Sequence, residues 1–150
     1  MALLTSNTAS DLITRINRLH RDSKGQWGKM TVEQMMVHCA AGIRLGLGEL
    51  PSKIRISPIR GAIARWLYVD LFPFPKSAPS PAELNINKKL TLRLEFDEAK
   101  KQLVSEIKKM AEIPDNFQFP PHPIFHKLSA RQWRKLGYKH LDHHLKQFGV

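Results

Sequence analysis

The C-terminal segment, residues 139–150, contains the residue pattern with the clearest chemistry. His140 and His144 stand four positions apart in a segment whose apolar residues recur with a helical period. Side chains at positions i and i+4 lie one above the other on the same face of a helix. Two imidazoles placed in this way can bind one divalent metal ion. A catalytic metal site also needs a third ligand and a pocket, which other elements must supply.

A helical wheel of about 100° per residue separates the histidines of this segment. With His140 at zero, His144 falls at about 40°, between His140 and the buried side, whereas His143 falls at about 300°. Asp142 falls at about 200°, which predicts an exposed residue rather than a ligand. Gln147, at about 340°, lies one turn beyond His144 and is placed to orient that ring or a bound molecule.

His38 is the candidate for the third ligand. It shares its side of a second predicted helix with Met35 and Gly42, so we expect it to point into the protein interior. Gly42, one turn further, leaves room for another helix or a ligand to approach. Three neutral imidazoles from two facing helices would leave open positions on a metal ion, which can lower the pKa of a bound water or thiol. The same three residues also fit a second interpretation, in which they are only polar residues of a helical core.

The starts of the two helices that carry these histidines are well marked. Thr31 with Gln34, and Ser129 with Gln132, have the spacing of a capping box. We therefore predict one helix from Thr31 to about Leu47 and a last helix that begins at Ser129.

Periodicity predicts that most of the remaining chain is helical too. The expected elements are a first helix around 12–20 with Ser10 as N-cap, a short helix from Pro58 with Ile59, Ile63 and Trp66 on one apolar side, and a helix over 97–111. Two proline-rich loops are expected at 72–81 and 114–127. The strand-like alternation over 90–96 is interpreted as an extended approach to the next helix, since it has no partner. The prediction is an all-α fold, a four-helix bundle with an extra short helix, forming one domain over 1–150.

Composition narrows the classes of protein to which the chain can belong. Cys39 is the only cysteine, so no internal disulfide framework exists. The N-terminal residues lack the pattern of a secretory signal, and no apolar stretch has the length of a membrane span. These features predict a cytoplasmic protein with no membrane partner.

The formal net charge of +11 needs an explanation. Residues 51–150 carry most of it, with a net of +9. Such a charge can attract nucleic acid or an acidic partner. The basic residues are nevertheless dispersed among acidic ones, as on an ordinary solvated surface, and we do not expect nucleic acid to be the partner.

Taken together, these motifs resemble those of the DinB/YfiT superfamily of metal-dependent enzymes. The resemblance rests on a histidine early in the second helix, then His-x-x-x-His followed by glutamine near the end of the last helix. A more detailed set of residues is similar to a DinB-related branch of unknown function. This set consists of residues 27–31, 34–35, 38–39, 122–125, 138–140, 143–145 and 147–149. The region 50–95 contributes little to it.

The resemblance implies a four-helix bundle with one divalent metal, zinc or nickel, held by His38, His140 and His144. It also implies a small-molecule substrate, the use of a low-molecular-weight thiol, and a homodimer. Combined with the residue pattern, it predicts a metal-dependent transferase or hydrolase that activates a thiol or water. The alternative is a basic helical protein without catalysis that binds nucleic acid or an acidic partner.

Four further residues are candidates for the pocket around this site. His122 precedes a proline that keeps it out of a helix, so it either lines the pocket mouth or is an ordinary loop residue. Cys39 follows His38 directly and is either a thiol near the metal or a packing residue. Trp133, like Trp27 and Trp66, is expected in the core or the pocket wall. Gln147 completes the set, whereas His126 is expected on the surface.

Overall fold

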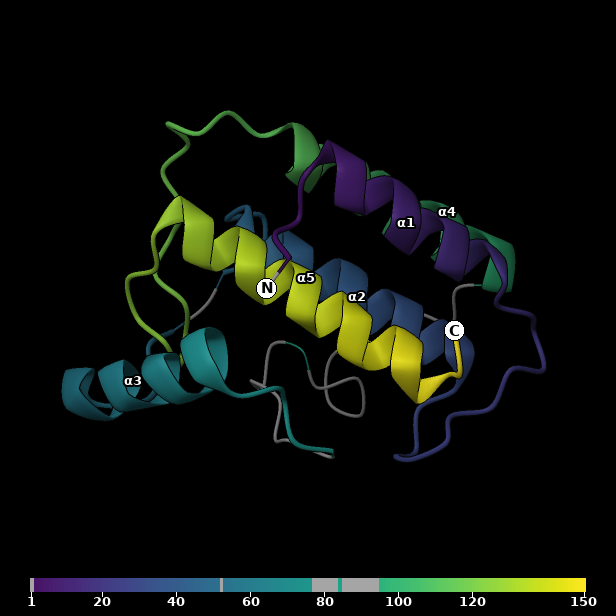
Figure 1. Ribbon diagram of the computed structural model, residues 1–150, viewed down its shortest axis with the longest axis horizontal. Coiled ribbons are helices and arrows are strands. Elements are labelled where there is room, and N and C mark those ends of the chain that lie inside the picture. Colours follow the sequence, from purple (N-terminus) through teal and green to yellow (C-terminus); the bar gives the residue numbers. More distant parts are fainter. Residues whose placement is uncertain (1, 52, 77–83, 85–94) are drawn as a thin grey trace.

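The computed structural model describes residues 2–51, 53–76, 84 and 95–150. Its elements are the α-helices α1 (Ser6–Asn17), α2 (Val32–Gly46), α3 (Pro58–Ala64), α4 (Phe96–Glu112) and α5 (Ala130–Gln147), and the π-helix η1 (Arg65–Leu71). The only extended pairing among the described residues is an isolated antiparallel bridge between His122 and His126. The prediction of an all-α fold is thereby confirmed for this part of the chain (Figure 1).

Both predicted capping boxes are present and fix the starts of α2 and α5. The Thr31 hydroxyl accepts a hydrogen bond from the Gln34 backbone N–H, and the Ser129 hydroxyl accepts one from Gln132. The glutamine side chains bond back to the cap residues. These contacts satisfy N–H groups that a helix start leaves without partners, which is why the sequence located both starts correctly.

The predicted start of the first helix was wrong. The cap of α1 is Thr5, whose backbone N–H donates to the Thr8 hydroxyl at 2.9 Å, and Ser10 lies inside the helix. Position 5 was overlooked because the apolar stripe begins only at Ala9 and Leu12, one turn later. By contrast, α4 and α3 begin within one residue of their predicted starts. The strand-like stretch falls mostly on positions outside the described residues.

The long helices enclose the main hydrophobic core. α2 packs against α4 and α5, and α1 packs against the same two helices (Figure 1). Burying one leucine, isoleucine or methionine side chain stabilises the folded state by roughly 1.5–3 kcal/mol, so this core supplies the main stabilisation of the fold. Its fully buried side chains include Leu12, Ile16, Met35, Met36, Leu103, Ile107, Met110, Leu141 and Leu145.

The short helix α3 and the π-helix η1 lie beside this core, and their apolar side does not face it. Ile59 is 75% exposed, Ile63 54% and Trp66 57%. The expectation that Trp66 is a core or pocket residue was therefore wrong. The opposite side is the packed one, because Gly61 lies against the His126 ring and Val69 is fully buried.

Lys139 ties η1 to α5. Its ammonium group donates to the backbone carbonyl of Phe72 at 2.7 Å and also contacts the carbonyls of Tyr68 and Val69. The chain after η1 is thereby held across α5, which places Phe74 over the histidines of that helix. None of the helices in the described part combines the length and apolarity that a bilayer crossing requires.

Candidate metal centre

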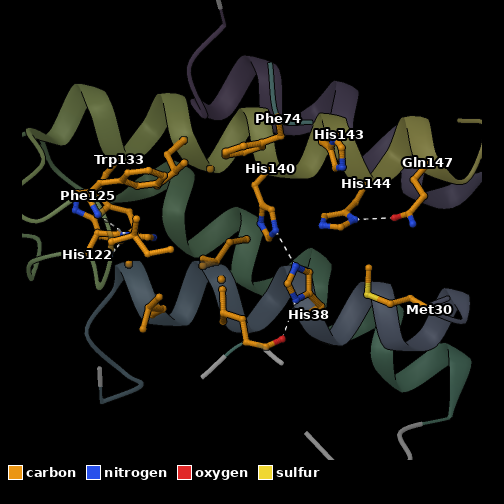
Figure 2. Close-up of a pocket in the computed structure, with 18 of the residues that line it drawn as sticks. Met30, His38, Phe74, His122, Phe125, Trp133, His140, His143, His144 and Gln147 are labelled. Carbon is orange, nitrogen blue, oxygen red and sulfur yellow. Dashed lines mark hydrogen bonds between the residues drawn. The ribbon is translucent and has the colours of Figure 1, made fainter. Parts of the chain in front are cut away.

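Helices α2 and α5 bring the three predicted histidines together (Figure 2). His38 projects from α2, and His140 and His144 project from α5 toward it. One ring nitrogen from each lies within 4.8 Å of the others, and the Nε2 atoms of His38 and His140 are 2.9 Å apart. Residues separated by about a hundred positions in the chain thus form one cluster of donor nitrogens.

Gly42 provides the space for the His140 ring. A Cβ atom at this position would lie 3.1 Å from both Cε1 and Nδ1 of His140. Such an approach is tighter than ordinary van der Waals contact, so a side chain at position 42 would displace the imidazole. The room expected at Gly42 is used by the proposed ligand itself.

Hydrogen bonds at the Nδ1 atoms orient two of the three rings. His38 Nδ1 lies 3.0 Å from the Leu84 carbonyl, and His144 Nδ1 lies 2.8 Å from Oε1 of Gln147. Both partners are acceptors, so each Nδ1 carries the proton and donates it. The Nε2 atom of each ring therefore holds a lone pair. An outer contact of this kind typically orients metal-binding histidines.

Gln147 is itself held in place. Its amide group donates to the Trp27 carbonyl at 2.6 Å. The adjacent Gly28 has a φ of +79°, and a Cβ there would lie 2.6 Å from the Gln147 amide nitrogen. A residue with a side chain would be strained in this conformation and would also collide with the amide. The Trp27–Gly28 pair of the sequence motif therefore supports His144 through Gln147.

Burial keeps the imidazoles of the cluster neutral. It lowers the pKa of His144 to about 3 and the pKa of His38 below its usual value. Burial also lowers the pKa of His140 well below 6.5, and the neighbouring histidines add to this effect. Charging any of these rings would bring a cation into a desolvated site. The neutral form is also the one that binds a metal ion.

The cluster lies in a cavity of about 610 Å³, a size typical of small-molecule sites. Figure 2 shows the histidines midway along it, with Trp133, Phe125 and His122 toward one end and Met30 and Gln147 toward the other. Other lining residues include Trp27, Lys29, Ile43, Leu45, Phe74, Leu84, Met110 and Leu136. Most of this wall is apolar, which favours a small molecule with an apolar body.

Three of the four additional pocket candidates line this cavity: Gln147, His122 and Trp133. Cys39 does not line it, which corrects the expectation that placed it there. It is 1% exposed in the core, where its thiol approaches the Met35 sulfur at 3.8 Å. One residue along a helix is a rotation of about 100°, enough to turn Cys39 from the face of His38. Burial raises the pKa of the Cys39 thiol, which opposes a nucleophilic role.

Two surface assignments need revision. His126 is a structural residue with a φ of +57°, and its Nε2 atom lies 2.9 Å from the Ile56 carbonyl. Asp142 is only partly exposed, because it pairs with Arg15 at 2.9 Å and with Lys146 at 2.8 Å. It is not among the clustered ligands.

His143 and the Leu84 carbonyl contribute to the site and were missed from the sequence. His143 is half-buried and lines the cavity, with its ring centroid 5.7 Å from that of Trp27 and 6.1 Å from that of Phe74. The helical wheel placed His143 away from the buried side of the helix. It could not show that the segment containing Phe74 covers the side on which His143 lies. Leu84 contributes a backbone carbonyl, for which a sequence carries no signal. Trp27, by contrast, was expected in the core or the pocket wall, and it lines the cavity.

A family model described as "Protein of unknown function (DUF1569)" matches residues 2–149. No curated protein and no solved structure shows a significant match to the chain. The match spans every element that builds the cavity, from the Trp27 segment to Gln147.

Proposed function

Because the chain belongs to the family described as DUF1569, a protein of unknown function, we propose a function from its site: a divalent-metal-dependent enzyme acting on a small molecule. One observation carries this proposal. Ring nitrogens of His38, His140 and His144 lie within 4.8 Å of one another inside a cavity of about 610 Å³. A pair of histidines on one helix is common, and a third on a facing helix inside a pocket supports the proposal of a metal-dependent catalytic centre.

The donor set fits zinc or nickel. Three neutral imidazoles, two of which (His38 and His144) have an Nε2 lone pair fixed by the partner at Nδ1, match the nitrogen ligands that these ions accept, and three protein ligands leave a position open. His38, His140 and His144 would hold the ion. Once bound, it would supply Lewis acidity that lowers the pKa of a thiol or water at that open position.

The protein's own residues would perform the remaining tasks. Gln147 and the Leu84 carbonyl orient His144 and His38 before any ligand arrives. Phe74, whose ring centroid lies 6.4 Å from that of His140, would cover the centre and limit the access of water in this proposal. The apolar wall would hold the body of the substrate, and a thiol-dependent transfer or a hydrolysis would follow.

Several finer features belong to the same proposal. We infer that α1, α2, α4 and α5 form a DinB-like four-helix bundle, as their pairwise packing supports. The resemblance also favours a homodimer and a low-molecular-weight thiol as co-substrate. Cys39, a buried free thiol, is compatible with the cytoplasm as the proposed location.

Metal analysis of the purified full chain tests the proposal. We expect about one equivalent of zinc or nickel by plasma mass spectrometry, and loss of that metal in His38→Ala, His140→Ala and His144→Ala. His143→Ala, which removes a neighbouring imidazole outside the ligand set, should retain it. Equal metal content in all four variants would sink the assignment. Salt-sensitive retention on DNA that a chelator does not affect would instead favour the basic binding protein.

A further inference from the structure

The cavity extends beyond the histidine cluster to an end formed by His122, Phe125 and Trp133, here called the aromatic end. On α5, Trp133 comes two turns before His140, roughly 10 Å along the helix axis. On α2, Gly42 lies against His140, and Gly46, one turn later, lies against Trp133. The two helices therefore carry the cavity from the cluster to the aromatic end, as Figure 2 shows.

The walls of the aromatic end are flat rings in fixed positions. The rings of His122 and Phe125 stack with centroids 4.5 Å apart and planes at 23°. Trp133, whose centroid lies 5.4 Å from that of His122, is stacked from another side by Phe119 at 5.8 Å and 19°. His122, Phe125 and Trp133 are all buried. A rigid enclosure of flat rings favours a planar ligand, because stacked and edge-to-face contacts require flat partners.

The described residues that form the aromatic end include no Asp, Glu, Lys or Arg. Among the described residues that line the cavity there is no acidic side chain, and the only lysine or arginine is Lys29. Lys29 belongs to the opposite end, where the adjacent Gly28 contacts Gln147. His122 accepts two backbone N–H groups at its Nδ1 atom, at 3.1 and 3.2 Å, so that nitrogen carries no proton and the ring is neutral. Among the side chains of the described lining, a charged group bound here would be desolvated and would find no oppositely charged partner at this end.

We propose that the aromatic end binds a neutral, planar aromatic part of the substrate, while the reactive group of that substrate faces the three histidines. This inference rests on the proposed function, which makes this cavity the substrate site. It adds the chemical class of the substrate: an uncharged one- or two-ring aromatic compound.

Calorimetric titration of the full chain with 2-naphthol, after removal of metal with a chelator, tests this subsite separately from the metal. We expect saturable binding of one equivalent, at least tenfold weaker in Trp133→Leu. A second variant, Gly46→Ala, should also bind about tenfold more weakly, because its Cβ would lie 3.0 Å from the Trp133 ring. Trp66→Leu is the matched control and should bind within twofold of the unmodified chain, since Trp66 is exposed outside the cavity.

Three results would overturn the proposal. The first is the absence of saturable 2-naphthol binding by the unmodified chain. The second is an affinity for 2-naphthol in Trp133→Leu and Gly46→Ala equal to that of the unmodified chain. The third is binding of cyclohexanol, or of the anion 2-naphthoate, that is as tight as the binding of 2-naphthol or tighter. Because the titration uses metal-free protein, a failure to bind 2-naphthol would contradict the aromatic subsite but would not affect the result of the metal analysis. Conversely, a chain that binds 2-naphthol but no zinc or nickel would contradict the proposed function and leave the aromatic subsite in place.

Discussion

Gln147 accepts a hydrogen bond from Nδ1 of His144 at 2.8 Å, and this contact sets the direction of the Nε2 lone pair of that ring. The glutamine lies one helical turn beyond His144 and is fixed from the other side by the Trp27 carbonyl. Gln147, which is not one of the three proposed metal ligands, therefore determines whether His144 faces the centre.

Replacing Gln147 by leucine should weaken zinc binding by about 10- to 100-fold, the usual effect of losing such an outer contact. The reason is that His144 loses the acceptor that orients its ring. Gln147→Glu keeps an acceptor for His144 but loses the donor to Trp27, so it should bind zinc more tightly than the leucine variant. Competition with a chromogenic chelator measures both affinities. Equal losses in the two variants would mean that the Trp27 contact, not the orientation of His144, is what matters.

Gly42→Ala should separate stability from metal binding. Alanine favours a helix interior over glycine by about 1 kcal/mol, so the metal-free variant should unfold at equal or higher denaturant concentration. Its Cβ would nevertheless displace the His140 ring from a 3.1 Å contact, and zinc affinity should fall by about tenfold. Gly137→Ala is the control, because its Cβ would lie at an ordinary 3.5 Å from Leu4. Unchanged zinc affinity in Gly42→Ala would contradict the packing described for His140.

The metal-free protein should lose stability as pH falls from 7 to 5. Burial lowers the pKa of His144 to about 3 and also lowers those of His38 and His140. In the unfolded chain these groups titrate near 6.5, so below that pH the unfolded state binds protons that the folded state excludes. Each group then contributes up to about 1.4 kcal/mol per pH unit to the loss.

Thermal denaturation in the presence of chelator measures this effect. The dependence on pH should be shallower in a His144→Gln variant and unchanged in His20→Gln, which alters an exposed histidine. A flat profile between pH 7 and 5 in the unmodified chain would show that the cluster is not buried as described.

Lys139→Met should destabilise the fold by roughly 1–3 kcal/mol. The ammonium group of Lys139 bonds to backbone carbonyls in and after η1, and its loss would remove this donor from one buried and two partly buried hydrogen bonds. Chemical denaturation is the direct measurement, with Lys146→Met as control because that lysine is largely exposed. Equal stability of the two variants would show that the carbonyls find other donors.

Local rules accounted for α2, α5 and the position of their histidines. Capping boxes are formed by residues three apart, and a helical wheel relates neighbouring turns, so both can be recognised in sequence. The wheel also preferred His144 to His143, and the structure places only His144 in the cluster.

What the sequence could not provide depended on tertiary contacts. The apolar side of α3 appeared to be a core face, yet Ile59 and Ile63 are exposed because Gly61 packs closely against the His126 ring. His143 was set aside because the wheel describes one helix and not the Phe74 segment that covers it. The Leu84 carbonyl is common to every residue type, so no pattern could reveal it.

The supports of the site have a consequence for how the sequence can vary. His38 bonds to the Leu84 carbonyl, Gln147 to the Trp27 carbonyl, and Lys139 to the carbonyls around Phe72. A substitution changes a side chain but leaves the carbonyl in place. As far as these hydrogen bonds are concerned, substitutions should therefore be tolerated better at the acceptor positions than at the donors His38, Gln147 and Lys139. A library of variants selected for zinc retention should show drift at position 84 and near invariance at position 147.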